Sequence, residues 1–409
     1  MGLTGGVSGI SGSFLGITYQ TNNFRGKGES LEASVTGGTR TTDFILSFTE
    51  PYFLDTRWNM GISLYNQRFR FDTFTFFGVT NPTTGKPTEL FTRRTTGATL
   101  TFSRPLRTRS FWRLGASYTY QRITVGGIQP GFEPYAQGQL AGFIPGGDAT
   151  KGGFIRSEVT PTLSFNTTNH YFNPTAGKSL SLSVGVSGGI LGGDFKMIRP
   201  AIEYRHFIPD RWISHKRNTI GFRFLGEYIQ AFGGSTAPFF DRFFVGGETT
   251  IRGFDIRSIS PMAISSTPRY DSQGAPIIDL NTGLPRVDRN IISTGGDTLA
   301  ILNAEYRIPI AGPLSVAAFY DIGLNRVSRP GALGNFGTST ISLLPSTNGV
   351  VRGSTGAEIQ FLLPVVSAPF RLIFAFNPQI FDDTINIGTV PFHAKEPRRE
   401  IKFTIGRSF

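Results

Sequence analysis

The sequence holds few residues that catalyse reactions or bind metals. Its 409 residues include 4 histidines and no cysteine, so disulfides, thiolate metal sites and cysteine nucleophiles are excluded. No pair among the histidines has the spacing of a zinc site. The stretch Gly185–Gly189 matches the nucleophile-elbow pattern, but no helix follows its serine, as that motif requires. We therefore expect no catalytic residue, no metal and no cofactor.

One cation stands out, in the glycine-rich stretch Phe244–Phe254. Arg252 is flanked by Ile251 on one side and by Gly253 and Phe254 on the other, and the glycines permit a tight hairpin. Exposed to water, this arginine has little consequence. If the stretch folds into an enclosed interior, Arg252 needs a carboxylate partner, because an unpaired buried charge is costly.

The elements around this stretch have the two-residue period of β-strands. In Ser179–Val184 the leucines and the valine share one face and the serines share the other. The C-terminal stretch Ile401–Phe409 repeats the pattern with an apolar face and a small polar face. A polar second face is typical of a water-filled barrel surrounded by lipid. No stretch approaches the roughly 20 apolar residues of a transmembrane helix.

The alternation predicts an all-β protein, an antiparallel transmembrane barrel of about 16 strands that forms one domain over residues 1–409. The predicted strands are 2–7, 13–23, 29–39, 41–50, 57–71, 91–104, 110–125, 154–168, 177–188, 194–208, 217–232, 297–310, 313–326, 350–363, 368–377 and 399–409.

The connections between these strands alternate in length. The short turns fall at 24–28, 51–56, 105–109, 169–176, 209–216, 311–312 and 364–367. The long stretches, rich in glycine and proline, fall at 72–90, 126–153, 233–296, 327–349 and 378–398. Because such barrels have short periplasmic turns and long extracellular loops, we expect both termini in the periplasm and 233–296 as the longest loop.

The alternation also supplies candidate partners for Arg252. In the strand 297–310, Glu305 falls on the face opposite the large apolar residues. In the strand 313–326, Asp321 does the same. Both carboxylates are therefore expected to point into the lumen, within reach of a loop that folds back.

The net charge of +12 would suit a nucleic-acid partner. Here the basic residues are scattered along the chain, many of them in short turns, and no RNA-binding signature or basic helix is present. Scattered charge is typical of a solvated surface. We expect no nucleic acid as a partner.

Several motifs resemble one family. The loop motif Ile251–Phe254, the segments Thr49–Asp55, Tyr171–Gly177 and Phe319–Gly323, and the terminal Phe409 are similar to the barrel domain of the bacterial surface-antigen superfamily. The closest branch is the BamA-type outer-membrane protein assembly factors. The matching segments follow the family order and span almost the whole chain.

This resemblance implies an integral protein of the bacterial outer membrane that assembles other proteins and is not an enzyme. The long loop is expected inside the barrel, with Arg252 paired to Asp321 and Glu305. The implied partners are unfolded outer-membrane protein clients, the bilayer with its outer-leaflet lipopolysaccharide, and periplasmic lipoproteins that act through POTRA domains. The family carries POTRA domains before the barrel and this sequence has none, so we expect a fragment of a longer protein.

The resemblance also implies a weak seam between the first and last strands. The first strand is short and glycine-rich, and a glycine in the last strand weakens pairing. Unpaired N–H and C=O groups at an open seam can accept a client strand. The expected seam residues are Leu3, Thr4, Val7, Ile401, Phe403, Ile405, Gly406 and Phe409.

Two other functions stay open. A two-partner secretion transporter of the same superfamily passes a client through the lumen and shares the loop motif, but it typically carries an N-terminal plug helix. No helical period occurs near Met1. A passive diffusion porin is the third interpretation, and a loop that fills the lumen argues against it.

Overall fold

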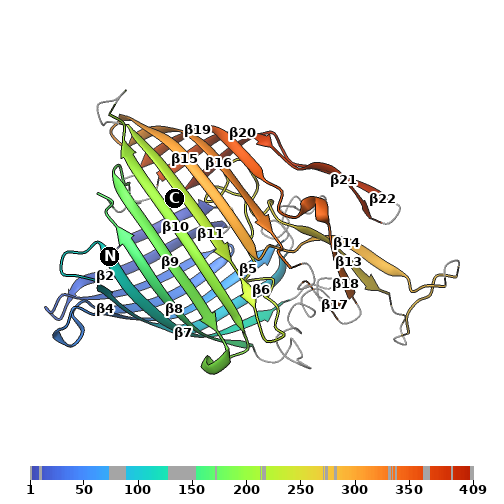
Figure 1. The fold of residues 1–409 in the computed structure, drawn as a ribbon, viewed down its shortest axis with the longest axis horizontal. Helices are drawn as coiled ribbons and strands as arrows, with labels where there is room; N and C mark the ends of the chain where they lie inside the picture. Colours follow the sequence, from blue (N-terminus) through green and yellow to red (C-terminus); the bar gives the residue numbers. More distant parts are fainter. Residues whose placement is uncertain are drawn as a thin grey trace.

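The computed structural model is dominated by one large barrel (Figure 1). It describes residues 2–8, 12–72, 89–127, 153–170, 173–211, 213, 218–269, 271, 275–280, 283–329, 333, 335–336, 339–362, 369–387 and 390–405. No helix in these ranges is long and apolar enough to cross a membrane. The short 3-10 turns are η1 (Phe53–Asp55), η2 (Gly189–Leu191) and η4 (Pro345–Thr347).

Sixteen antiparallel strands form the barrel wall, which confirms the predicted fold class. The first eight are β1 (Gly2–Ser8), β2 (Gly12–Phe24), β3 (Glu29–Gly38), β4 (Thr41–Glu50), β5 (Asn59–Asp72), β6 (Glu89–Pro105), β7 (Trp112–Gly126) and β8 (Phe154–Asn166). The others are β9 (Gly177–Ser187), β10 (Met197–Pro209), β11 (Thr219–Tyr228), β15 (Thr298–Ala311), β16 (Leu314–Arg326), β19 (Arg352–Leu362), β20 (Pro369–Gln379) and β23 (Arg399–Ile405). The two-residue strand β12 (Gln230–Ala231) continues β11 along β10.

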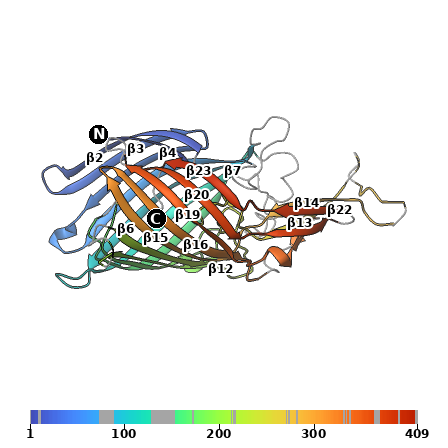
Figure 2. The same cartoon turned by 90° about the horizontal axis from the view of Figure 1, so that it is seen from above.

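Two smaller sheets lie beyond the barrel, in stretches predicted to be loops (Figures 1 and 2). One contains β13 (Met262–Pro268), β14 (Val287–Ser293), β17 (Asn335–Phe336) and β18 (Ser339–Leu343). The other is the hairpin of β21 (Asp382–Ile387) and β22 (Val390–Lys395). The prediction missed them because these strands are short and lack the strict alternation that a lipid face imposes on the wall.

The wall has the predicted apolar outer face and polar inner face. On β16, Tyr320 is exposed and the next residue, Asp321, is fully buried inside. On β23, Phe403 is 59% exposed and Thr404 is 4% exposed. The outward side chains are apolar because they face lipid, and the inward ones are polar because they face the lumen or the loop that occupies it.

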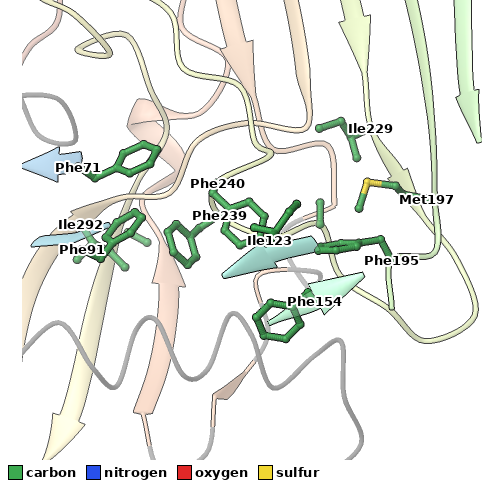
Figure 3. Close-up of a cluster of buried hydrophobic side chains, with 12 residues drawn as sticks. Phe71, Phe91, Ile123, Phe154, Phe195, Met197, Ile229, Phe239, Phe240 and Ile292 are labelled. Carbon is green, nitrogen blue, oxygen red and sulfur yellow. The ribbon is translucent and has the colours of Figure 1, made fainter. Parts of the chain in front are cut away.

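The two ends of the barrel differ. One end, the short-turn end, carries short turns such as those after β2 and β15, and the other, the long-loop end, carries both small sheets (Figure 2). Inside this second end, phenylalanines from the strand ends pack against phenylalanines that follow β12 (Figure 3). The rings of Phe71 and Phe91 stack with centroids 4.5 Å apart, and Phe239 meets Phe91 edge-on at 5.0 Å. We call this group of rings at the long-loop end the phenylalanine cap.

The first and last strands of the wall meet at a seam. In the part of the chain that the structure describes, β1 pairs with β2 alone and β23 with β20 alone. The two strands are nevertheless close, because a Cβ built on Gly6 would lie 3.6 Å from the carbonyl oxygen of Ile405. The barrel is thus nearly closed, without a described backbone ladder at the seam.

The two faces of β5 give a direct test of the membrane orientation of the wall. Leu64 is exposed on the outer face, whereas Ser63 lines an inner cavity of about 520 Å³. We expect Leu64→Arg to lower the free energy of unfolding by about 2–4 kcal/mol if it lies near the bilayer midplane. The matched variant Ser63→Arg should lower it far less, because the cavity is polar. Denaturant titrations in lipid vesicles measure both, and equal losses would contradict the assignment of faces.

Candidate functional site

The stretch Phe243–Ile259 folds back into the barrel, and we call it the lumen loop. Its two limbs are joined by an antiparallel bridge between Val245 and Ile259, and a second bridge forms at the tip. Ile251 and Phe254 are fully buried and pack in a cluster with apolar side chains of β15. The apolar members of the loop motif therefore fix the tip against the wall.

Gly253 allows the tip to approach the wall closely. Its φ is +84°, a conformation that side chains other than glycine rarely adopt. A Cβ at this position would lie 2.5 Å from the Cβ of Ala375 and 2.5 Å from Oδ1 of Asn377, both on β20. The motif needs glycine here because the loop main chain lies directly against β20.

Arg252 is 2% exposed and forms its strongest contacts with Asp321 on β16. Its Nε and Nη2 donate to the two carboxylate oxygens of Asp321 at 2.7 and 2.8 Å, and its backbone N–H donates to the same group at 3.0 Å. Asn303 on β15 adds another donor to Asp321 at 2.9 Å. This parallel geometry is the strong, bidentate form of an arginine–carboxylate pair.

Two further carboxylates surround the same guanidinium group. Nη1 of Arg252 donates to Glu305 on β15 at 3.3 Å and to Glu358 on β19 at 3.2 Å. The ring of Phe319 on β16 lies under the guanidinium, 4.0 Å from its carbon to the ring centroid. The planar cation thus engages three strands at once, which a lysine ammonium cannot do with the same geometry.

The two glutamates have arginine partners of their own. Arg371 on β20 donates to Glu358 at 2.5 and 2.8 Å, and Arg307 donates to Glu305. Together with Arg252 and Asp321, three guanidinium groups face three carboxylates. Burial alone would lower the pKa of Arg252, but the carboxylates raise it above its ordinary value. The charges of this cluster therefore balance, as a buried site requires.

Three inward-facing asparagines hold the main chain of the lumen loop. Asn303, Asn325 and Asn377 each donate an amide N–H to a loop carbonyl, at 2.7, 2.7 and 2.8 Å. The carbonyl groups belong respectively to Thr250, Phe243 and Gly253. All three amides are at most 2% exposed. The loop is thus fixed at its base and at its tip by groups on β15, β16 and β20.

The segment before the lumen loop contacts the opposite wall. Asp241 pairs with Arg156 on β8, and nearby Arg199 on β10 donates to both oxygens of Glu158 at 2.6 Å. Beside this group lies the 520 Å³ cavity, lined mainly by hydroxyl and amide side chains of β5, β6 and β7. The lumen therefore keeps a polar open space on this side.

The expected seam residues lie on two strands that face each other. Leu3, Thr4 and Val7 are in β1, where they pair with Ile17, Gly16 and Ser13 of β2. On β23, Ile401 and Phe403 point outward, 68% and 59% exposed, and Ile405 is half-buried. The side chains of Leu3, Thr4 and Val7, and the whole of Gly406 and Phe409, lie outside the described residues.

Across the described ranges, no three His, Asp or Glu side chains gather where they could hold a metal ion. The carboxylates of the lumen cluster are bound to guanidinium groups instead. The arrangement is suited to holding a loop in place inside a barrel.

The model of the Omp85 superfamily domain matches residues 23–409. The chain belongs to the Omp85 superfamily. It is also 27% identical over 324 residues to the outer membrane protein assembly factor BamA of Nitratidesulfovibrio vulgaris. That match covers 78% of this chain and 32% of the relative, so the chain spans about a third of the curated protein.

Solved structures of BamA and CdiB have the same fold. BamA from Haemophilus ducreyi, in a form lacking POTRA domains 1–3, matches with a TM-score of 0.63 at 20% identity, covering 98% of this chain and 69% of that one. CdiB from Escherichia coli matches with a TM-score of 0.57 at 10% identity, covering 98% and 62%. CdiB from Acinetobacter baumannii matches with 0.54 at 14% identity, covering 98% and 58%. At these identities the likeness establishes the fold.

Sequence reasoning missed two members of the Omp85 barrel's lumen cluster, Glu358 and Arg371. Strand alternation contained the signal. Glu358 precedes the outward-facing Ile359. Arg371 lies between Phe370 and Leu372, and Leu372 pairs with the outward-facing Phe403 of β23. Applying the inward-face rule to β19 and β20, as was done for β15 and β16, places both side chains in the lumen.

The cluster predicts strong coupling between Arg252 and Asp321. We expect Arg252→Ala to lower the free energy of unfolding by about 3–5 kcal/mol, because it leaves buried carboxylates uncompensated. Asp321→Ala should have a similar effect, and the double variant should lose much less than the sum. Denaturant unfolding in detergent measures this cycle.

The matched control for this cycle is Arg205→Ala. Arg205 also pairs with a carboxylate, Glu203 at 2.8 Å, but its side chain is 36% exposed. A change within about 1 kcal/mol is expected there. If Arg252→Ala and Arg205→Ala had equal effects, or if the Arg252 and Asp321 losses were additive, the buried pairing would be refuted.

Proposed function

We propose that this barrel is an outer-membrane protein assembly factor that inserts client β-barrels through the seam between β1 and β23. The observation that carries the proposal is the seam itself. In the described ladders, the strands within the wall have partners on both sides, whereas β1 and β23 have one partner each. The sequence similarity to BamA supports the same function.

The physical basis is the cost of unpaired backbone groups in a bilayer. Each free N–H or C=O group in hydrocarbon costs several kcal/mol, so a barrel edge demands a partner strand. A client strand that pairs with β1 or β23 satisfies these groups and is itself protected. The free energy of client folding then drives insertion, and no nucleotide is required.

In this proposal the short-turn end faces the periplasm, where both termini lie, and the long-loop end faces the lipopolysaccharide of the outer leaflet. The clients are unfolded outer-membrane proteins with alternating strands like those of this chain. Lipoprotein partners and recruitment through POTRA domains belong to the same proposal, by analogy with the family.

A disulfide across the seam tests the proposal. The chain has no cysteine, so cysteines placed at Gly6 and Thr404 report only on each other. Gly6 lies opposite Phe14, which alternates with the outward Leu15, and Thr404 alternates with the outward Phe403, so both positions face the lumen. A Cβ on residue 6 would lie 3.6 Å from the backbone oxygen of Ile405, the residue after Thr404. We expect oxidation to stop client insertion into vesicles and reduction to restore it.

The matched control places the cysteines at Ser63 and Thr99. These residues are direct partners on β5 and β6, away from the seam. This disulfide should leave insertion unchanged. Full insertion activity with a confirmed Gly6–Thr404 crosslink would contradict the proposed route through the seam.

The second candidate is a two-partner secretion transporter, which is favoured by the structural match to CdiB from two organisms. Such a transporter passes its client through the lumen, so a locked seam would leave export intact while a locked lumen loop would block it. The same disulfide therefore separates the two functions. A porin would show large steady openings in bilayer recordings, which the lumen loop and the phenylalanine cap oppose.

A further inference from the structure

Asn377 differs from the other two asparagines that hold the lumen loop. Its side-chain amide donates to the carbonyl of Gly253 at 2.8 Å and also to the carbonyl of Pro397 at 2.8 Å. Its backbone N–H donates to the carbonyl of Arg398 at 2.8 Å. Asn377 is fully buried. One side chain thus joins the tip of the lumen loop to the segment that leads into the last strand.

Pro397 lies directly before the last strand of the wall, β23. The described ladder between β20 and β23 begins with Phe376 opposite Arg399, only two residues after Pro397. Asn377 therefore holds the chain at the point where it enters β23. Because β23 has one described ladder partner, this anchor has more influence on its position than it would on a strand paired on both sides.

A second contact leads from the loop to the same strand. Lys402 on β23 donates to Asp255, three residues beyond Arg252, at 2.7 Å. The side chains are 21% and 44% exposed, so this ion pair is weaker than the buried cluster. It nevertheless places the inner face of β23 against the loop, at a position that follows Pro397 by five residues.

We propose that Asn377 is a positioning residue that couples the tip of the lumen loop to β23, so that its two hydrogen bonds set the width of the seam. This inference rests on the proposed function for its biological meaning. The coupling itself is a property of the barrel and is measured without a client.

The chemistry explains why an asparagine suits this position. Its amide nitrogen carries two N–H donors, and the two acceptors are main-chain carbonyls from separate segments. An aspartate has no donor when ionised, and an alanine leaves both carbonyls, of which that of Gly253 is buried, without this donor. In the described structure, the Oδ1 atoms of Asn303, Asn325 and Asn377 are all buried without a hydrogen-bond partner. Donation to the loop is therefore the shared role of the three amides.

Spin labels on the lipid face measure the coupling. Ile17 on β2 and Ile401 on β23 are 60% and 68% exposed, so labelled cysteines fit there. In the full chain in nanodiscs, we expect Asn377→Ala to raise the population of long Ile17–Ile401 distances about three- to tenfold, as the loss of two side-chain hydrogen bonds predicts. A label pair at Leu64 and Ile202, both exposed and away from the seam, should not change.

Asn303→Ala and Asn325→Ala are the matched controls. Each removes a buried amide that donates to a loop carbonyl, but neither amide donates to the segment before β23. Their Ile17–Ile401 distances should stay within the wild-type distribution. If all three variants widened the seam equally, a general loss of loop stability would explain the data and the specific role of Asn377 would be refuted.

Lys402→Ala serves if Asn377→Ala does not fold. It removes the other link between loop and strand at a more exposed position, and a smaller shift in the same direction is expected. Wild-type distances in a folded Asn377→Ala barrel, or in Lys402→Ala where that barrel does not form, would overturn the coupling. Client insertion by the same variants is a separate arm: a shifted seam with normal insertion keeps the coupling and contradicts the proposed function.

Discussion

A guanidinium group without a counter-charge cannot be buried at acceptable free-energy cost, and this constraint organises the inside of the barrel. Arg252 reaches the lumen on a loop, but its carboxylate partners come from β15, β16 and β19. Two of those carboxylates also need Arg307 and Arg371. The cluster is complete only when these strands and β20 are in register, so the seated loop and the folded C-terminal half of the wall require each other.

The contacts of the lumen loop are therefore distributed unevenly around the barrel wall. The polar contacts of loop residues 248–255 lead to β11, β15, β16, β19, β20 and β23. On the other side, β5, β6 and β7 line an open polar cavity. The seam therefore joins a strand that the loop braces from inside, β23, to a short glycine-rich strand, β1, whose described partner is β2 alone. The proposed opening at this junction rests on this difference in support between its two sides.

Much of this could be predicted from the sequence, because a lipid face and a polar lumen impose a period of two on every strand. The same rule placed Glu305 and Asp321 inside. The bonds made by Asn377 left no trace, since they end on main-chain carbonyls that every residue has. The strands beyond the barrel were missed for a related reason: in the segment Met262–Pro268, no lipid boundary imposes the alternation on which the prediction depended.

The four residues of the loop motif, Ile251–Phe254, have separate physical roles, and together they link the loop to the last strand. Ile251 and Phe254 are fully buried and hold the tip, while Arg252 fixes its depth through Asp321. Gly253 has a different task, because only a residue without a Cβ lets the main chain lie against β20. That close approach brings the Gly253 carbonyl within 2.8 Å of Asn377. The motif thus presents a backbone carbonyl to β20, and the Asn377 amide that donates to it also donates to Pro397, at the entry to β23.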